Sequence, residues 1–232
     1  MLRTVKNRKK KVYRINTSSP FAKPLFQLFC SERLMQISPK VKNIIELFIS
    51  ELDRNRLDTV ILFGSHVWGL GTERSDIDVC VVCSDKNTIA MVKNTAKKLF
   101  PEGRFEVHIY SPEDFKDVSD FVVLDSLLNG IPLIGSEYFF DTKGSIRHVD
   151  KKYLIHRLKM CEDYFKRSQK VRGPARDYFI DLIYVSLGEI RSILEHKVTI
   201  PKKKIIERPN ISVEIERLHR EISRLGDKIW LE

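Results

Sequence analysis

The chain has 232 residues, which allow one or two domains with a sizeable core, and it carries a formal net charge of +10 at pH 7. No apolar run approaches a membrane span and no apolar region follows the N-terminal charges, so we expect a cytoplasmic protein without signal peptide or membrane partner. The positive charge indicates anionic partners, and we expect the four cysteines to be packing residues in a reducing compartment.

The N-terminal stretch is strongly basic. Met1 to Arg14 contains seven Lys or Arg residues and no acid. Alternation up to Asn16, with Tyr13 and Ile15 on one face, predicts two short strands around a basic tip. An unstructured basic tail is the alternative. No recognition helix is visible beside this stretch, so we expect non-specific contact with nucleic-acid phosphates rather than base reading.

Two helices are predicted next. Residues 21–34 follow a Ser-Ser-Pro turn and are apolar enough to pack as a linker helix. Ser38 and Pro39 supply the N-cap and first-turn proline of a second helix, which runs to about Asp53. We expect the apolar stripe of this helix to cover a sheet. The stripe comprises Val41, Ile44, Ile45, Phe48 and Leu52.

A glycine-serine turn follows the first predicted strand of the sheet. Residues 60–63 are an apolar run that ends at Gly64 and Ser65, which predicts a buried strand leading into a helix N-terminus. Glycine lets backbone N–H groups approach a phosphate, and the positive end of a helix favours the anion. We therefore expect Gly64 and Ser65 to bind nucleotide phosphates, together with the neighbouring His66 and Ser75.

Acidic residues on two predicted strands form the candidate metal site. Asp76 and Asp78 open a strand that runs to Val82, and alternation places both carboxylates on one face. Glu106 is the acid of a second strand-like run, 104–110. Clustered carboxylates near a phosphate-binding turn are what Mg²⁺ or Mn²⁺ requires. We predict Asp76, Asp78 and Glu106 as the metal ligands and catalytic residues.

His108 lies two residues beyond Glu106 and should share its strand face. A neutral imidazole there could accept a proton from the acceptor or orient a carboxylate. The alternative is a partly exposed strand residue with no catalytic role.

Further elements complete this domain. Asn87 is a candidate cap for a helix through Leu99, and 120–129 predicts a helix stopped by Gly130. Residues 131–134 form another apolar strand or sheet edge, and the domain is expected to close near Asp141.

Beyond Asp150 the apolar period becomes helical. Helices are expected over 153–165, 174–196 and 212–231, separated by glycine and proline breaks. Arg191 and His196 match a short Arg-x4-His arrangement that would suit RNA cleavage, with arginine for phosphate and histidine for acid–base work. A plain helix C-terminus with His196 near its negative end is the competing interpretation.

The glycine-serine turn, the Asp76/Asp78 pair ten residues later and Glu106 resemble the DNA polymerase beta-type nucleotidyltransferase superfamily, in its minimal nucleotidyltransferase branch. The resemblance covers roughly Lys40 to Asp141. Small members often carry Ala-Arg-Gly after the turn, whereas this chain has Val67-Trp68-Gly69. A phosphate-reaching arginine is therefore missing, and we expect Trp68 to pack against the core or cover a neighbouring surface rather than stack on a base or ribose.

The resemblance implies a fold and a domain order. The class is α+β, with a small mixed β-sheet covered by helices and followed by a C-terminal helical bundle. The expected domains are a basic hairpin with its linker helix (1–36), the nucleotidyltransferase domain (37–141) and the bundle (148–232). The basic hairpin resembles the wing in archaeal proteins that fuse a winged helix to such a domain. The bundle resembles those of aminoglycoside nucleotidyltransferases and of HEPN proteins.

The resemblance also implies an activity. It is the two-metal transfer of a nucleoside monophosphate, AMP in our prediction, from ATP or another NTP to an acceptor hydroxyl, releasing pyrophosphate. The acceptor is a small molecule, a protein or RNA, and the sequence does not choose among them. It also leaves the oligomeric state open, with a homodimer as one option. A DNA-binding regulator that uses the domain as a nucleotide sensor is the alternative from another class. An HEPN-type ribonuclease is a further alternative.

Overall fold

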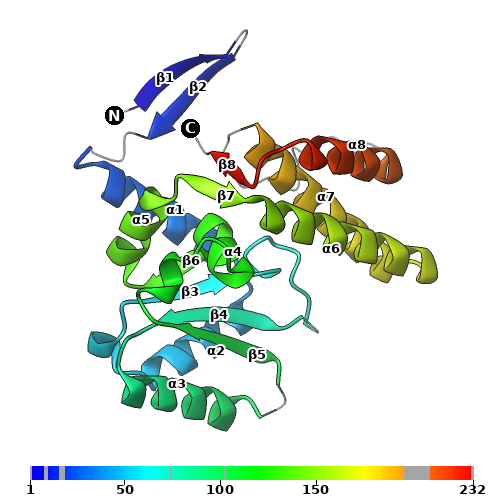
Figure 1. Cartoon of the computed structure of the whole chain (residues 1–232). Helices are drawn as coiled ribbons and strands as arrows, with labels where there is room; N and C mark the ends of the chain where they lie inside the picture. Colours follow the sequence, from blue (N-terminus) through cyan, green and yellow to red (C-terminus); the bar gives the residue numbers. More distant parts are fainter. Residues whose placement is uncertain are drawn as a thin grey trace.

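The computed structural model describes residues 19–73, 75–101, 103–195 and 210–230, together with the backbone of 2–7 and 10–15. At the N-terminus, β1 (Leu2–Asn7) and β2 (Lys10–Ile15) pair antiparallel, with Leu2 opposite Ile15. The predicted pair of strands is therefore confirmed for the backbone. In Figure 1 this hairpin projects from the rest of the chain, beside α1 (Ala22–Met35).

A four-stranded mixed sheet lies at the centre of the N-terminal half, in the order β5-β4-β3-β6. Its strands are β3 (Thr59–Phe63), β4 (Ile77–Val82), β5 (Phe105–Tyr110) and β6 (Ile131–Ile134). β3 pairs antiparallel with β4 and β6, whereas β4 and β5 run parallel. All four strands were predicted from the sequence, and the expected mixed sheet is confirmed.

Helices cover both faces of this sheet. On one face, α2 (Pro39–Ser50) and α3 (Lys86–Leu99) pack their apolar residues against alternate positions of β3 and β4. On the other face lie α4 (Phe121–Asn129) and α5 (Ser136–Ser145). Short 3-10 turns, η1 (Arg54–Arg56) and η2 (Asp114–Lys116), precede β3 and α4. Figure 1 shows α2 and α3 on the side of the sheet away from the C-terminal helices.

The helix caps follow local side-chain chemistry. Ser38 Oγ accepts from the Val41 N–H at 3.4 Å, as expected for the start of α2. The start of α3 differs from the prediction, because Asp85 rather than Asn87 is its N-cap, with Oδ2 accepting from the Thr88 N–H at 2.9 Å. An aspartate carboxylate also complements the positive end of the helix better than a neutral amide.

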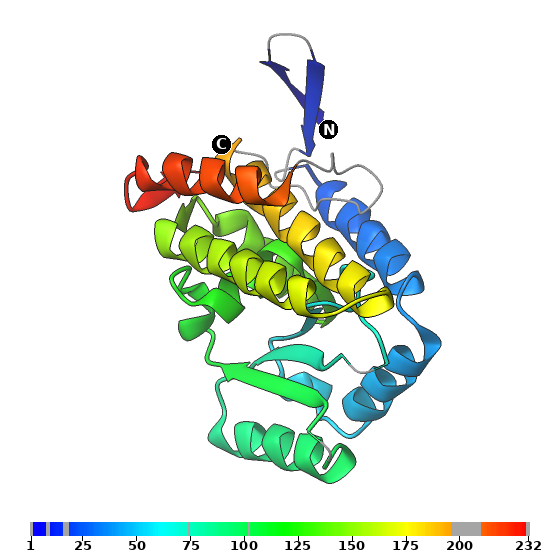
Figure 2. The same cartoon turned by 90° about the vertical axis from the view of Figure 1, so that its right-hand side faces the viewer.

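The C-terminal part consists of α6 (Lys151–Lys170), α7 (Pro174–Leu194) and α8 (Ile211–Ser223). The predicted last helix extended to residue 231, but α8 ends at Ser223. The chain then forms β8 (Lys228–Trp230), which pairs antiparallel with β7 (His148–Asp150). Figure 2 shows α6 and α7 running alongside each other, with α8 across one end.

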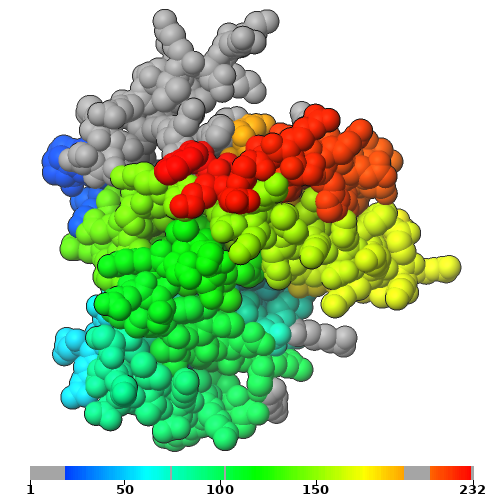
Figure 3. All heavy atoms as spheres, in the orientation of Figure 1, coloured from blue at the N-terminus to red at the C-terminus, as the bar shows by residue number. Residues whose placement is uncertain are grey.

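Helix α4 joins the two parts, because it is buried on two sides. Val123 and Leu127 pack in the core on the sheet, whereas Leu124 and Leu128 pack in the core of the C-terminal helices. The space-filling view shows the two parts in contact, with the sheet region in cyan to green and the bundle in yellow to red (Figure 3). Among the described residues, no helix is long and apolar enough to cross a membrane.

Candidate active site

A cavity of about 550 Å³, which we call the acidic cavity, lies between the sheet and the C-terminal helices. One wall comes from the turn after β3 and from β4 and β5, and the opposite wall from α4, α6 and α7. Asp76, Asp78 and Glu106 line it from the sheet side, and Arg157 lines it from the helical side. The cavity therefore depends on both parts of the chain.

Gly64 allows a carboxylate to lie directly against the turn. Its φ is +76°, a conformation that side-chain-bearing residues rarely adopt. A Cβ at this position would lie 2.1 Å from Oδ2 of Asp78. The β3–β4 ladder causes this approach, because it pairs Phe63 with Asp78. Glycine is therefore required here for its backbone conformation and for the space that it leaves.

Three side chains form a group that can hold a metal ion. Parallel pairing places Asp78 opposite Glu106, and His108 follows two residues later on the same strand face. One ligand atom from each of these residues lies within 4.8 Å of those of the other two. His108 Nε2 is 3.8 Å from Glu106 Oε2. Two carboxylates and an imidazole can provide oxygen and nitrogen ligands to a divalent cation.

The electrostatics of the group favour a cation. Burial, followed by the charges of Glu106, Asp125 and Asp76, raises the pKa of Asp78 to about 7. A carboxylate with a raised pKa is one whose negative charge lacks compensation. A positive ion at the group would supply that compensation, so the residues present fit a divalent metal.

The other predicted site residues lie at different places around the turn. Asp76 is exposed just before β4 and lines the acidic cavity, but it lies outside the three-residue group. Ser65 and Ser75 also line the cavity. Ser75 Oγ accepts from the Thr72 N–H at 2.9 Å, which holds the segment that leads into β4.

The helix predicted after Ser65 is wrong: residues 65–69 form consecutive turns. Backbone N–H groups of Trp68, Leu70 and Gly71 all donate to the Ser65 carbonyl, so the chain curls around that oxygen. The dipole of a following helix therefore does not contribute here. Phosphate binding at this turn would rely on the Ser65 hydroxyl and on those backbone N–H groups that do not donate within the turn.

His66 points away from the acidic cavity. Its side chain is buried, with only 8% of the residue exposed, and Nε2 lies 3.5 Å from the Ser75 carbonyl oxygen. It lines a second cavity on the other side of the turn. Burial, opposed by the Ser75 contact and by Asp76, lowers the pKa of His66. We therefore infer that this residue positions the turn rather than touching phosphate.

Trp68 packs against the C-terminal helices, as the sequence interpretation expected. Its side chain joins a cluster with Leu70 and with Leu182 and Val185 of α7. The guanidinium carbon of Arg157 lies 4.8 Å from the centre of the Trp68 ring. This cation–π contact places an arginine from α6 beside the position where small members of the superfamily carry theirs on the turn.

A buried polar network, which sequence reasoning missed, surrounds Arg157. Arg157 Nη2 donates to Asp125 Oδ1 of α4 at 2.7 Å, and Nε is 2.7 Å from Glu189 Oε2 of α7. Tyr153 and Asn129 each donate to Glu189 Oε1 at 2.6 Å. Charged residues inside apolar helix stripes are the signal that could have revealed it, because such residues are rarely buried without partners.

The residues of the ribonuclease alternative are only partly described. Arg191 Nε donates to Glu214 Oε1 at 2.7 Å, an ion pair that joins α7 to α8. His196 lies outside the described residues. The guanidinium of Arg191 therefore has a role in helix packing.

The sheet, the glycine-serine turn and the facing acids define a domain of the nucleotide-transferring class. Residues 42–132 match the family model described as "Nucleotidyltransferase domain". The chain therefore contains a nucleotidyltransferase domain of the DNA polymerase beta-type superfamily. The matched range excludes the basic hairpin and the C-terminal helices. No curated protein matches the chain.

Proposed function

We propose that the chain transfers a nucleoside monophosphate, AMP from ATP, to an acceptor hydroxyl in a reaction that requires Mg²⁺ or Mn²⁺ and releases pyrophosphate. The observation that supports this most is the convergence of Asp78, Glu106 and His108 on one point of the acidic cavity, directly beside Gly64. The nucleotidyltransferase domain supports the transfer chemistry in general.

The residues of the sheet side would bind the nucleotide. Gly64 and Ser65 would contact the β- and γ-phosphates through backbone N–H groups and a hydroxyl, and Ser75 would hold the segment next to them. Asp76, Asp78 and Glu106 would hold two divalent ions, and His108, although it lies close enough to be a ligand, would keep its imidazole free to accept a proton. When bound, such ions neutralise phosphate charge and lower the pKa of the attacking hydroxyl.

The proton of the acceptor hydroxyl would pass to a side chain at the edge of the group. Glu106 is exposed to the cavity and carries a carboxylate oxygen 3.8 Å from His108 Nε2. Either residue can accept a proton in this geometry, and the other would then stabilise the charge that results. The phosphorus–oxygen bond to pyrophosphate breaks as the acceptor oxygen bonds to the α-phosphate.

The acceptor would enter from the helical side. That wall contains Met160, Tyr164 and Tyr178 beside Arg157 and Asp125. Such a mixture of aromatic and charged groups can bind a small molecule, a protein side chain or an RNA end. We propose all three acceptor classes for testing.

The test is incubation of the protein with Mg²⁺ or Mn²⁺ and each labelled NTP, with an aminoglycoside, an RNA oligonucleotide or a protein extract as acceptor. The proposal expects label transfer from ATP to one acceptor class, with stoichiometric pyrophosphate. Binding of Mg-ATP without pyrophosphate under every condition would contradict transfer. It would favour the nucleotide-sensing regulator, an alternative that the paired strands β1 and β2 motivate.

A further inference from the structure

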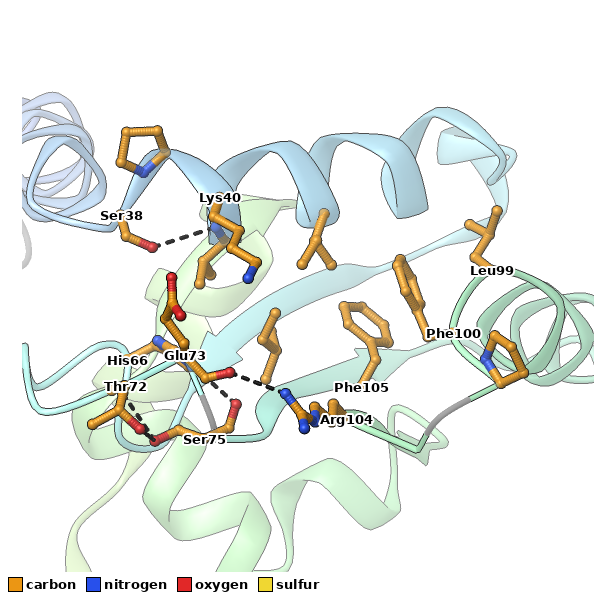
Figure 4. A pocket seen from close by; sticks show the side chains of 16 residues that line it. Ser38, Lys40, His66, Thr72, Glu73, Ser75, Leu99, Phe100, Arg104 and Phe105 are labelled. Atoms are coloured by element: carbon orange, nitrogen blue, oxygen red, sulfur yellow. Dashed lines mark hydrogen bonds between the residues drawn. The ribbon is translucent and has the colours of Figure 1, made fainter. Parts of the chain in front are cut away.

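A second cavity, of about 690 Å³, lies on the opposite side of the 71–75 segment from the acidic cavity. We call it the α2 pocket, because the N-terminus of α2 forms one end of it. Figure 4 shows polar side chains, including Ser38, Lys40 and His66, toward one end and Leu99, Phe100 and Phe105 toward the other. The pocket is therefore amphipathic along its length.

The apolar end is a rigid aromatic wall. The ring centre of Phe105 lies 4.5 Å from that of Phe100 and 4.7 Å from that of Phe48. Phe105 is itself buried in the core under α2, so it cannot move without disturbing that core. Ile44 of α2 faces the same space. A wall of this kind fits a flat aromatic ring system.

The polar end favours negative charge. Ser38 to Val41, the first turn of the twelve-residue helix α2, lines the pocket, and a helix N-terminus carries a partial positive charge. Among the described residues that line the pocket, Lys40 and Arg104 are the cations and Glu73 is the acid; Figure 4 shows Lys40 and Glu73 toward the polar end and Arg104 closer to Phe105. Arg104 Nη1 donates to the Glu73 backbone carbonyl at 3.2 Å, which fixes the guanidinium beside the pocket. The described lining residues therefore carry one more positive than negative charge, which together with the start of α2 favours a ligand with one anionic group.

We propose that the α2 pocket binds a small aromatic anion, with its ring system against Phe100 and Phe105 and its anionic group toward Lys40 and the N-terminus of α2. This site is distinct from the proposed nucleotide site, since none of these three residues lines the acidic cavity. A ligand there contacts His66, whose Nε2 lies 3.5 Å from the carbonyl of Ser75, the residue before Asp76. Thr72 and Ser75 line both cavities.

The probe for this site is 8-anilinonaphthalene-1-sulfonate, an aromatic anion whose fluorescence rises on binding. Its partner is N-phenyl-1-naphthylamine, which has the same ring system without the sulfonate. The proposal expects saturable one-site binding of the sulfonate to the full chain in the presence of saturating Mg-ATP. It also expects weaker binding of the neutral amine, because the cationic end would gain nothing from it.

Two variants locate the binding. Ile44→Trp should fill the pocket, and Lys40→Glu should reverse its rim charge; each is expected to weaken sulfonate binding about tenfold or more. Leu47→Trp, on the exposed side of the same helix, and Lys93→Glu, on α3, are the matched controls and should bind like wild type. Circular dichroism checks each fold. Lys40 is exposed, so its variant keeps the test valid if Ile44→Trp does not fold.

The proposal is overturned if sulfonate affinity is unchanged in the folded pocket variants, or if it falls equally in the controls. Equal affinity for the sulfonate and the neutral amine would also overturn it, because the polar end would then have no role. These results do not depend on turnover, so they stand apart from the outcome for the transferase activity.

Discussion

The contact between Gly64 and Asp78 determines the geometry of the proposed metal site. A carboxylate can lie against the turn only because position 64 has no Cβ and because Asp78 is paired with Phe63. Burial of this carboxylate, together with the nearby charges of Glu106, Asp125 and Asp76, raises the pKa of Asp78 to about 7. Gly64 thus fixes the position of the Asp78 carboxylate, while burial and the neighbouring acids determine its charge balance.

Gly64→Ala should therefore remove activity and destabilise the fold. The left-handed backbone costs about 1–2 kcal/mol for alanine, and the new methyl group must also displace the Asp78 carboxylate. Gly69→Ala is the matched control, because Gly69 has a φ of +69° but nothing within 4 Å of a Cβ. Urea denaturation and pyrophosphate release check both variants. Equal losses in the two would show that the Asp78 contact does not matter.

His108→Ala tests the proton-accepting role of the imidazole. His108 lines the acidic cavity, 3.8 Å from Glu106. If His108 handles the proton, turnover should fall by about tenfold or more with little change in KM, because only the transition state uses this group. His219→Ala is the control, because His219 is exposed and contacts Glu162 of α6 but does not line the acidic cavity. Wild-type turnover of His108→Ala between pH 6 and 9 would leave Glu106 as the base.

Buried ion pairs link three helices around the acidic cavity. Arg157 of α6 connects Asp125 of α4 with Glu189 of α7, and all three side chains are almost fully buried. The pairs hold the helical wall of the acidic cavity at a fixed place relative to the sheet. On the outer side of the bundle, Arg191 of α7 pairs with Glu214 of α8 and joins the two helices, while Arg217 pairs with the same carboxylate within α8.

Arg157→Met should lower the free energy of unfolding by about 3–5 kcal/mol, because it leaves Asp125 and Glu189 buried without their cation. Arg167→Met, an exposed position on the same helix, should change it by less than about 0.5 kcal/mol. Equilibrium urea denaturation at pH 7 measures both. A similar small change in the two variants would show that the network contributes little.

Glu214 gives a pH-dependent prediction. Burial would raise the pKa of Glu214, but hydrogen bonds from Arg191 and Arg217 outweigh it and hold the pKa at about 2, below the ordinary 4.5. The ionised carboxylate of Glu214 therefore stabilises the folded state fully above pH 4.5, and this contribution is lost as the pH falls toward 2. Glu214→Gln should lower the free energy of unfolding by about 1–3 kcal/mol at pH 7, and its difference from wild type should shrink as the pH falls.

The control for this prediction is Glu216→Gln, at an exposed position of the same helix. Denaturation curves between pH 3 and 7 compare the two variants. A cost for Glu214→Gln that stays constant over this range would rule out the ion pairs as its source.

Across the whole chain, structure could be predicted from the sequence where a local residue pattern determines it. The four strands of the central sheet follow from apolar runs and turn residues, and Ser38 and Gly130 mark helix ends. The positions of Asp78, Glu106 and His108 follow from strand alternation and parallel pairing. The site was therefore predictable as far as it depends on the sheet.

The remaining features depend on contacts between distant segments. β7 and β8 are three residues each, too short for a periodic signal. They pair with each other although α6, α7 and α8 lie between them along the chain. The turn after Ser65 curls rather than becoming a helix, and its Trp68 packs against α7. The contribution of Arg157 to the acidic cavity requires that α6 lie against α4, which no local pattern reveals.

Pyrophosphate release from Mg-ATP by Asp78→Asn tests whether the acidic cavity is the catalytic site. The substitution keeps the size of the side chain but removes the carboxylate that lies against Gly64 and opposite Glu106. Asp163→Asn, at an exposed position on α6, is the control for the loss of one carboxylate. We expect Asp78→Asn to fold and to release pyrophosphate at least about a hundredfold more slowly, while Asp163→Asn matches wild type. Wild-type release by a folded Asp78→Asn variant would contradict the assignment of the acidic cavity as the catalytic site.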